Sequence, residues 1–193
     1  MHTKRIFEEH LALMKDILQN KMLIEKINEI IQIIITCYKN NNKVIFFGCG
    51  GSAADSQHLA AEFINKFNFE RRCLPAIALT TDTSVITAIS NDYDFEKVFS
   101  RQVEGLVHEH DVVIGISTSG RSRSVIRGLQ AAKNNNAITI AMTGNYIHDV
   151  EHVADHIISI PSTSTPRIQE AHITIGHILC QGVEQYFLTG TEL

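Results

Sequence analysis

Hydrophobic and polar residues follow two different periods along this chain. Short runs rich in β-branched and aromatic residues are typical of buried strands, and apolar residues three and four positions apart are typical of amphipathic helices. The expected strands are Val44 to Phe47, Ala76 to Leu79, Asp111 to Ser117, Ala137 to Met142 and His156 to Ile160. Since strands alternate with helices, the pattern predicts an α/β fold with a parallel sheet covered on both faces.

Capping residues and turn residues set the expected limits of the helices. Ser52 is expected to cap the helix after the first strand, and Thr165 to cap the last helix with Pro166 in its first turn. A turn is expected at Asn91 to Asp94. The other helices expected after the first strand are Glu96 to Leu106, Arg121 to Asn134 and Tyr146 to Ala154, and the last helix runs to about Leu188.

Two amphipathic helices are expected before the first strand, over Thr3 to Asn20 and Leu23 to Tyr38. The apolar stripe of the first helix consists of Phe7, Leu11, Met14 and Leu18. Such a stripe needs a cover, which is either the core of the same chain or another subunit. The sequence leaves both possibilities open.

Composition limits the class of protein. The length of 193 residues and the absence of a linker predict one domain over 1–193, with helices in 1–41 and an α/β core in 42–193. A formal net charge of -4 argues against nucleic acid as a partner, and no apolar run is long enough to span a membrane. The cysteines form no CxxC pair, which favours reduced thiols and a cytoplasmic location: Cys37, Cys49, Cys73 and Cys180.

The end of the first strand carries the first group of candidate site residues. Gly48, Gly50 and Gly51 break the strand before the helix that Ser52 starts, and backbone N–H groups at such a turn bind anions. His58 and Glu62 lie four residues apart on that helix and therefore share one face.

The end of the third strand carries a second group, from Ser117 to Ser122, which we call the serine loop. Its hydroxyl and N–H donors at a helix start suit phosphate oxygens, although the same residues can simply cap a helix and fill a turn. The chain has neither a Walker loop nor a dinucleotide-binding fingerprint.

The last helix carries the remaining candidates. Gln169 and His177 are eight residues apart, roughly 80° around the helix, so they can serve the same side. His172 is interpreted as a core residue. His148, His152 and His156 recur every fourth residue, which would suit a metal stripe, but surface positions are the simpler interpretation.

Several of these segments together resemble bacterial phosphoheptose isomerases, members of the sugar-isomerase (SIS) domain group. The resemblance rests on GCGGSAADSQHLAAEF, PAIALTTDTS, NDYDFEKVFSRQVE, DVVIGISTSG and RIQEAHITIGHILC, in that order, and covers about Lys43 to Glu184. It implies a three-layer αβα sandwich with a five-stranded parallel sheet, assembled as a homotetramer. It also implies one zinc ion per subunit.

The resemblance also assigns roles to residues. The family's zinc ligands fall on His58, Glu62, Gln169 and His177, with Glu62 and His177 as the acid–base pair. The implied substrate contacts are Gly50, Gly51, Ser52, Glu62, Asn91, Asp92, Ser117, Thr118, Ser119, Ser122 and Gln169. This chain has Cys49 where the family has asparagine. It also has Arg121 within the serine loop and Arg123 directly after it, where the family has other residues. The sequence leaves the roles of these three residues open.

The implied reaction converts sedoheptulose 7-phosphate to D-glycero-D-manno-heptose 7-phosphate through an enediol. It is the first step towards ADP- or GDP-heptose precursors of lipopolysaccharide or capsule. Aldose–ketose isomerisation needs an acid, a base and stabilisation of an enediolate oxygen, which this residue set can provide. The alternatives are a non-catalytic sugar-phosphate-binding module and a protein scaffold, and the retained acid–base pair argues against both.

Overall fold

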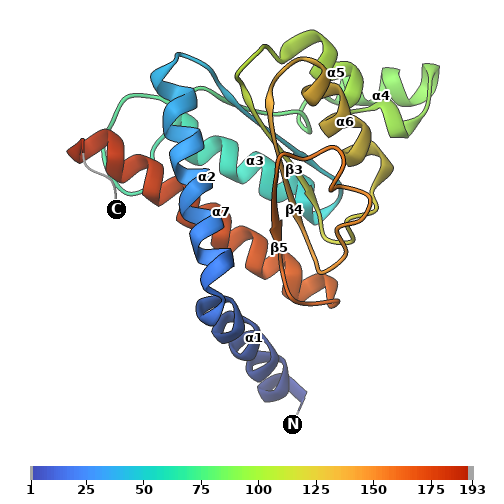
Figure 1. Cartoon of the computed structure of the whole chain (residues 1–193). Coiled ribbons are helices and arrows are strands. Elements are labelled where there is room, and N and C mark those ends of the chain that lie inside the picture. The colour runs from blue at the N-terminus through green and yellow to red at the C-terminus, as the bar shows by residue number, and fades with distance from the viewer. Residues whose placement is uncertain (1, 191–193) are drawn as a thin grey trace.

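The computed structural model describes residues 2–190, so residue 1 and residues 191–193 of the expected domain lie outside the described part. All strands pair in parallel in one five-stranded sheet of order β2-β1-β3-β4-β5 (Figure 1). The strands are β1 Val44–Gly48, β2 Ala76–Ala78, β3 Val112–Ser117, β4 Ile138–Thr143 and β5 His156–Ser159. Every residue of β1 and β3 is buried, as expected for central strands covered on both faces.

The helices form layers on the two faces of the sheet, which confirms the predicted sandwich. One layer packs against the sheet face that carries Phe46 and Ile114, and the other against the face that carries Phe47 and Val113. The first layer contains α2 Lys21–Lys39, α3 Gly51–Ile64 and α7 Thr165–Thr189, and the second contains α5 Ser100–Leu106 and α6 Arg123–Asn134. Among residues 2–190, no helix is long and apolar enough to span a membrane.

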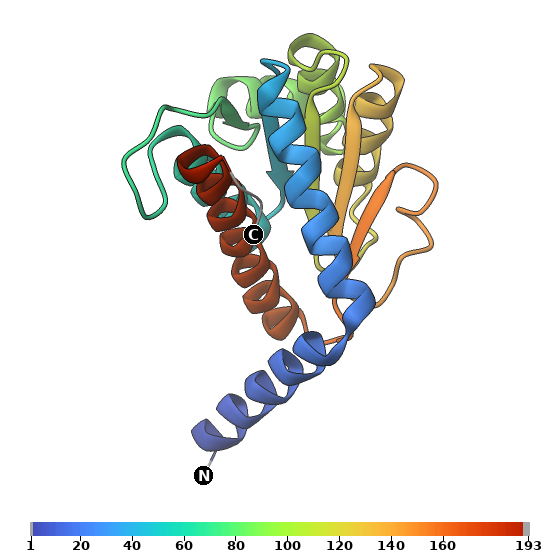
Figure 2. The same cartoon turned by 60° about the vertical axis from the view of Figure 1, so that its left-hand side comes forward.

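The first helix, α1 His2–Gln19, extends away from the body of the molecule (Figure 2). Only Leu13 and Ile17 of this helix are buried. The predicted stripe residues Phe7, Leu11 and Leu18 are exposed, at 66%, 65% and 74%. The core of the same chain therefore covers Met14 and leaves the other three residues of the stripe exposed.

Three predicted boundaries were wrong. Asn91 and Asp92 are the last residues of α4 Thr83–Asp92 and not part of a turn. The segment from residue 96 to 106 is divided into a 3-10 turn, η1 Phe95–Lys97, and the short helix α5. Residues 146–154 form turns and no helix, because the segment packs on the sheet and α6 through Val150 and Val153, which are buried as turn residues.

The helix caps also differ from the prediction. Ser52 lies inside α3, and Gly50 is the N-cap. Ser164, and not Thr165, precedes the first residue of α7, and its side chain makes no capping hydrogen bond. Pro166 occupies the first turn as expected.

The strand order places the carboxyl ends of β1 and β3 side by side. In the register of this pair, Gly48 lies beside Ile116, so the turn after β1 and the loop after β3 begin at the same level. The chain leaves β1 towards β2 on one side and reaches β3 on the other. In open parallel sheets ligands bind at this change of direction, where the following loops diverge.

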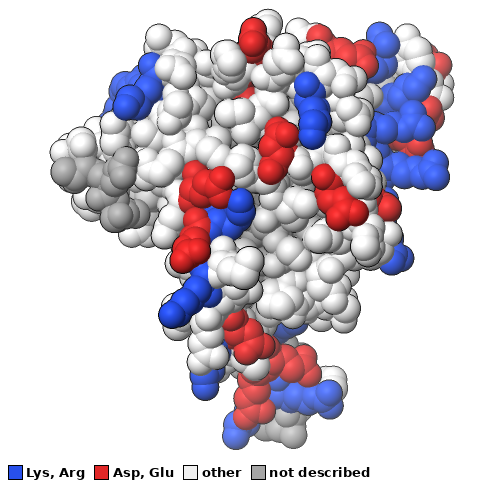
Figure 3. All heavy atoms as spheres, in the orientation of Figure 1, with Lys and Arg blue, Asp and Glu red and all other residues white. Residues whose placement is uncertain are grey.

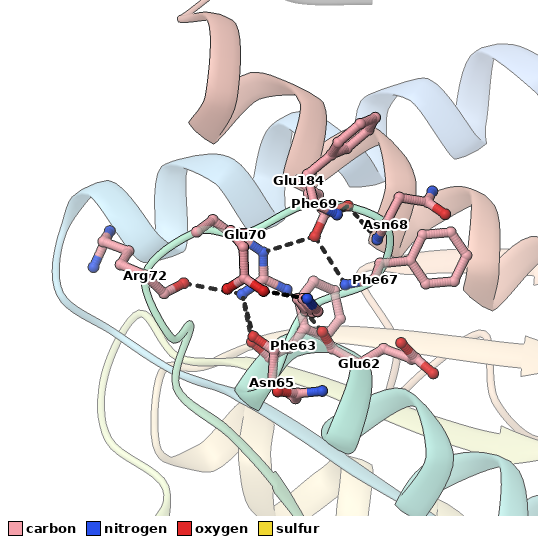
Figure 4. A network of polar contacts seen from close by, with 11 residues as sticks. Glu62, Phe63, Asn65, Phe67, Asn68, Phe69, Glu70, Arg72 and Glu184 are labelled. Carbon is pink, nitrogen blue, oxygen red and sulfur yellow. Dashed lines mark hydrogen bonds and ion pairs between the residues drawn. The ribbon is translucent and has the colours of Figure 1, made fainter.

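A buried ion pair joins the segment after α3 to the end of α7 (Figure 4). The carboxylate of Glu184 accepts hydrogen bonds from the backbone N–H groups of residues 67–69 and from the Arg71 guanidinium. Arg71 also donates to the carbonyl oxygens of Glu62 and Phe63. The pair therefore fixes the end of α3 against α7.

His172 is buried between α7 and β4, which confirms its interpretation as a core residue. Its Nε2 donates to the carbonyl oxygen of Thr143 at 3.2 Å, and its Nδ1 is buried without a partner. Burial disfavours the charged imidazole and lowers the pKa of His172 to about 4.

This pKa predicts a loss of stability on acidification. Between about pH 6.5 and pH 4 the unfolded chain binds a proton at His172 and the folded chain does not, so the free energy of unfolding falls as the pH falls. We expect the wild type to lose about 2 kcal/mol more than His172→Gln between pH 7 and pH 5. Urea unfolding at both pH values measures the difference. The exposed control His108→Gln should behave like the wild type, and equal losses in all three proteins would contradict the prediction.

Candidate active site

The turn after β1 is built from glycines that allow a close approach. A Cβ at Gly48 would lie 2.8 Å from the carbonyl oxygen of Ile116, and Gly50 has a φ of +59, which favours glycine. Gly50 then caps α3 without a side chain, and the N–H groups of residues 52 and 53 donate within the turn, to the carbonyl oxygens of residues 49 and 50. The turn therefore has the form of an anion-binding helix start.

Close contact between α3 and α7 brings two predicted site segments together. A Cβ at Gly51 would lie 2.2 Å from Nε2 of Gln169, and a Cβ at Gly176 would lie 2.6 Å from Leu59. Glycine at both positions lets the helices approach, and it places the amide of Gln169 directly against the start of α3.

Two imidazoles meet across the same helix pair. Nε2 of His58 on α3 and Nε2 of His177 on α7 are 2.8 Å apart, and Oε1 of Glu62 lies 3.5 Å from Nε2 of His58. The ring of Phe67 packs on His177 with a centroid separation of 5.3 Å. The structure thus brings together three residues that the sequence predicted as one group.

The donor atoms of this group suit a transition metal, because two imidazoles and a carboxylate are normal zinc ligands. Within residues 2–190, however, no three His, Cys, Asp or Glu side chains are arranged so as to hold a metal ion. The two Nε2 atoms touch each other at 2.8 Å, whereas tetrahedral zinc ligands at 2.0–2.1 Å would place them roughly 3.3 Å apart. The residues fit the metal chemically, and binding would need a small separation of the rings.

Asp55 is a site residue that the sequence analysis missed. It is buried at 8% exposure on α3, and its Oδ2 has no hydrogen-bond partner among the described residues 2–190. Burial raises the pKa of Asp55, while a hydrogen bond to Gln169 and the nearby charges of His58 and His177 oppose that rise. Its position one turn before His58, on the same helix face, is the signal that could have identified it.

The loop after β3 forms a compact cluster of hydroxyl groups. The Oγ atoms of Ser117 and Ser119 accept hydrogen bonds from the backbone N–H groups of Ser122 and Arg121. Gly120 has a φ of +65, and a Cβ there would lie 2.1 Å from the carbonyl oxygen of Tyr146. The loop therefore packs directly on the segment that follows β4. The backbone N–H of residue 144 in that segment also donates a hydrogen bond to the carbonyl oxygen of Thr118.

Cys49 connects the two loops. Its half-buried Sγ lies 3.3 Å from Oγ of Ser124 and 3.9 Å from Oγ of Ser122, and its side chain packs on the apolar cluster beneath. Through Cys49 the turn of residues 49–52 thus touches Ser122, at the end of the serine loop, and Ser124 of α6, and through Gly51 it touches Gln169. A ligand bound along this turn would reach both the imidazole pair and the serine loop.

Other predicted residues lie apart from this group. Asn91 and Asp92 are exposed at the end of α4, hydrogen-bonded to each other, and nothing in residues 2–190 bonds them to the imidazole pair or the serine loop. His148 and His152 are exposed near Glu151, and His156 faces Glu29. The exposure of His148 and His152 agrees with the surface interpretation, whereas His156 is half-buried in β5.

Known proteins match this chain along most of its length. A family model described as SIS domain matches residues 2–144. The phosphoheptose isomerase of Aquifex aeolicus is 55% identical over 161 residues, which cover 83% of this chain and 84% of the relative. That of Nitratiruptor sp. is 48% identical over 187 residues, covering 93% and 99%.

Solved structures agree with the sequence matches. A phosphoheptose isomerase from Francisella tularensis superposes with a TM-score of 0.91 at 32% identity, covering 95% of this chain and 96% of that one. The Neisseria gonorrhoeae phosphoheptose isomerase gives a TM-score of 0.85 at 37% identity, covering 96% and 100%. The fold and the sequence define a SIS-domain protein. Within that group, the chain belongs to the phosphoheptose isomerase family.

The contact between Gly51 and Gln169 leads to a test of the site. Gly51→Ala should change the free energy of unfolding by less than about 1 kcal/mol relative to the wild type. Alanine favours a helix, and the amide of Gln169 is the flexible end of its side chain. Isomerase activity should fall about tenfold or more, because Gln169 must leave its place. Urea unfolding and a turnover assay measure the two effects. Gly105→Ala, where a Cβ meets nothing within 4 Å, is the control, and equal activity of the two variants would refute the assignment.

Proposed function

We propose that this chain isomerises sedoheptulose 7-phosphate to D-glycero-D-manno-heptose 7-phosphate, the first step in making nucleotide-activated heptose precursors. The observation that carries the proposal is that α3, which begins at the turn after β1, carries His58 and Glu62 against His177, while the same turn contacts the serine loop. An open-chain sugar phosphate has a reactive carbonyl end and a phosphate end. The names of the close relatives support the same reaction.

Glu62 and His177 serve as the acid–base pair in this proposal. Moving a proton between neighbouring carbons needs a group at each carbon, and both side chains are partly exposed on facing helices. Glu62 takes a proton from one carbon while His177 serves the other. The ring of Phe67 packs on the imidazole of His177. The Arg71 network holds the backbone of Glu62, and the carboxylate of Glu62 points away from that network (Figure 4).

A zinc ion in each subunit would be held by His58, Glu62, Gln169 and His177. As a Lewis acid it would polarise the oxygens of the reacting carbons. Asp55 accepts a hydrogen bond from the Gln169 side chain, so it would orient the amide that holds the metal. An amide oxygen is a weaker ligand than imidazole, which predicts moderate metal affinity.

The phosphate end of the substrate is assigned to the serine loop. Ser117, Thr118, Ser119 and Ser122 offer hydroxyl and N–H donors, and Gly50, Gly51 and Ser52 add the start of α3. Asn91 and Asp92 are proposed to contact the hydroxyl groups of the sugar. A cytoplasmic location is proposed because all the cysteines are free thiols.

Proton NMR of sedoheptulose 7-phosphate tests the reaction and its metal dependence. We expect anomeric signals of heptose 7-phosphate to appear with the purified protein. A chelator should slow their appearance and added zinc should restore it. A substrate that broadens on binding but stays unchanged in both samples would contradict the proposal and favour a binding module.

Glu62→Gln tests the role of Glu62 in turnover, and the zinc content of the variant separates its acid–base role from its role as a metal ligand. Loss of a general base typically costs about 10²–10⁴-fold in rate, so kcat should fall by that factor while thermal stability and phosphate binding stay unchanged. Glu25→Gln, an exposed change on α2, is the matched control. Unaltered turnover in Glu62→Gln would rule out this role.

A homotetramer is proposed as the assembly, and the exposed stripe of α1 supports it. Phe7, Leu11 and Leu18 on this helix, with Met22 at 81% exposure on α2, form an apolar surface on a part that extends from the body. In a symmetric assembly the same surface of two subunits forms the interface, so the stripe of a second copy can cover this one.

Light scattering during size-exclusion chromatography tests the assembly. The wild type should have four times the mass of one chain, and Leu11→Glu should shift it towards smaller species by placing charge in the interface. Ala12→Glu adds the same charge about 100° around the helix and should leave the mass unchanged. A monomeric wild type, or no shift for Leu11→Glu, would contradict the proposal.

A further inference from the structure

A second polar hollow lies beside the serine loop, outside the site described above. It has a volume of about 550 Å³, within the range of small-molecule sites. Its walls come from the loop after β3, from α6 and from the segment after β4. The lining residues are Arg121, Arg123, Ile126, Arg127, His148, Asp149 and His152.

The positive charge in this hollow is only partly compensated. Arg123 and Arg127, one turn apart on α6, share the single carboxylate of Glu96 at 3.5 Å and 2.7 Å. Arg121 has no carboxylate partner among residues 2–190, and Asp149 is the one acidic residue of the lining. Figure 3 shows that Lys and Arg gather at the right-hand edge of the molecule, on the side where α4 and α6 lie in Figure 1. In a chain of net charge -4 this is a local excess of positive charge.

The hollow is also held in shape. The guanidinium of Arg121 stacks on the ring of Tyr146 at 3.9 Å from its centroid, which fixes its plane. The Tyr146 hydroxyl donates to Asp149, so the acidic side chain is partly occupied within the wall. Val150 and Val153 anchor the wall on the apolar cluster shared with α6. A fixed guanidinium loses little entropy when it binds an anion.

We propose that this hollow binds the diphosphate group of a nucleotide-sized molecule. Guanidinium groups bind phosphate oxygens in pairs, and three of them around one hollow can serve two phosphates. The volume exceeds the need of a single phosphate and suits a small organic diphosphate. The proposal goes beyond the proposed function and does not depend on it, because Arg121 is the one residue of the serine loop that lines this hollow, and none of the hydroxyl residues assigned to the sugar phosphate does.

Isothermal titration with inorganic pyrophosphate and with ADP, in the presence of saturating sedoheptulose 7-phosphate, tests the site. Both probes should bind, and adenosine, which has no phosphate, should not. If sedoheptulose 7-phosphate abolished the binding, the probes would occupy the substrate site and the proposal would be wrong. If neither probe bound, it would also be wrong.

Variants locate the binding within the hollow. Arg123→Gln and Arg127→Gln should each weaken pyrophosphate binding about tenfold, because each removes a charged hydrogen-bond donor. The double control Lys97→Gln/Arg101→Gln removes two positive charges that stack on Tyr93, outside the hollow, and should leave the affinity unchanged. Thermal melting confirms that each variant is folded. Equal weakening by the control and by Arg123→Gln/Arg127→Gln would show general charge attraction and overturn the proposal.

Discussion

The ion pair between Arg71 and Glu184 is the constraint on which the site depends. Both side chains are almost fully buried, and charges out of water persist only when hydrogen bonds compensate them. Glu184 accepts from backbone N–H groups after α3, and Arg71 donates to carbonyl oxygens at the end of that helix. The pair therefore closes the open ends of an irregular segment and holds two helices in one relative position. Glu62 lies in the last turn of α3 and Phe67 in the segment that follows it, so the ion pair holds both of these site residues in position.

The small turn after β1 positions the remaining parts of the candidate site. The thiol of Cys49 in its first half touches Ser122 of the serine loop, and Gly51 in its second half touches the amide of Gln169 on α7. Parallel strands bring these neighbours to one edge of the sheet, since β1 and β3 end at the same level. One turn thus sets the distance between the two ends that a sugar phosphate would occupy.

Much of this arrangement could be predicted from the sequence, because it depends on local patterns. The strands, the spacing of His58 and Glu62, and the glycine turn each follow from periodicity within a few residues. The contact of His58 with His177 joins residues 119 positions apart, and only the resemblance to a family indicated it. Asp55 was missed because the residue pattern of α3 alone does not show which of its residues become buried against α7. Residues 146–154 were wrongly predicted as a helix, since their conformation is decided by packing on α6.

The contact of Gly120 with the Tyr146 carbonyl oxygen links two loops that follow different strands. A hydrogen bond from residue 144 to Thr118 strengthens the link. The serine loop and the segment after β4 therefore form one mechanical unit, and neither can swing outward without the other. If the loop opens to release a product, the moving body includes residues of both segments. Its motion is then slower and more collective than that of a single free loop.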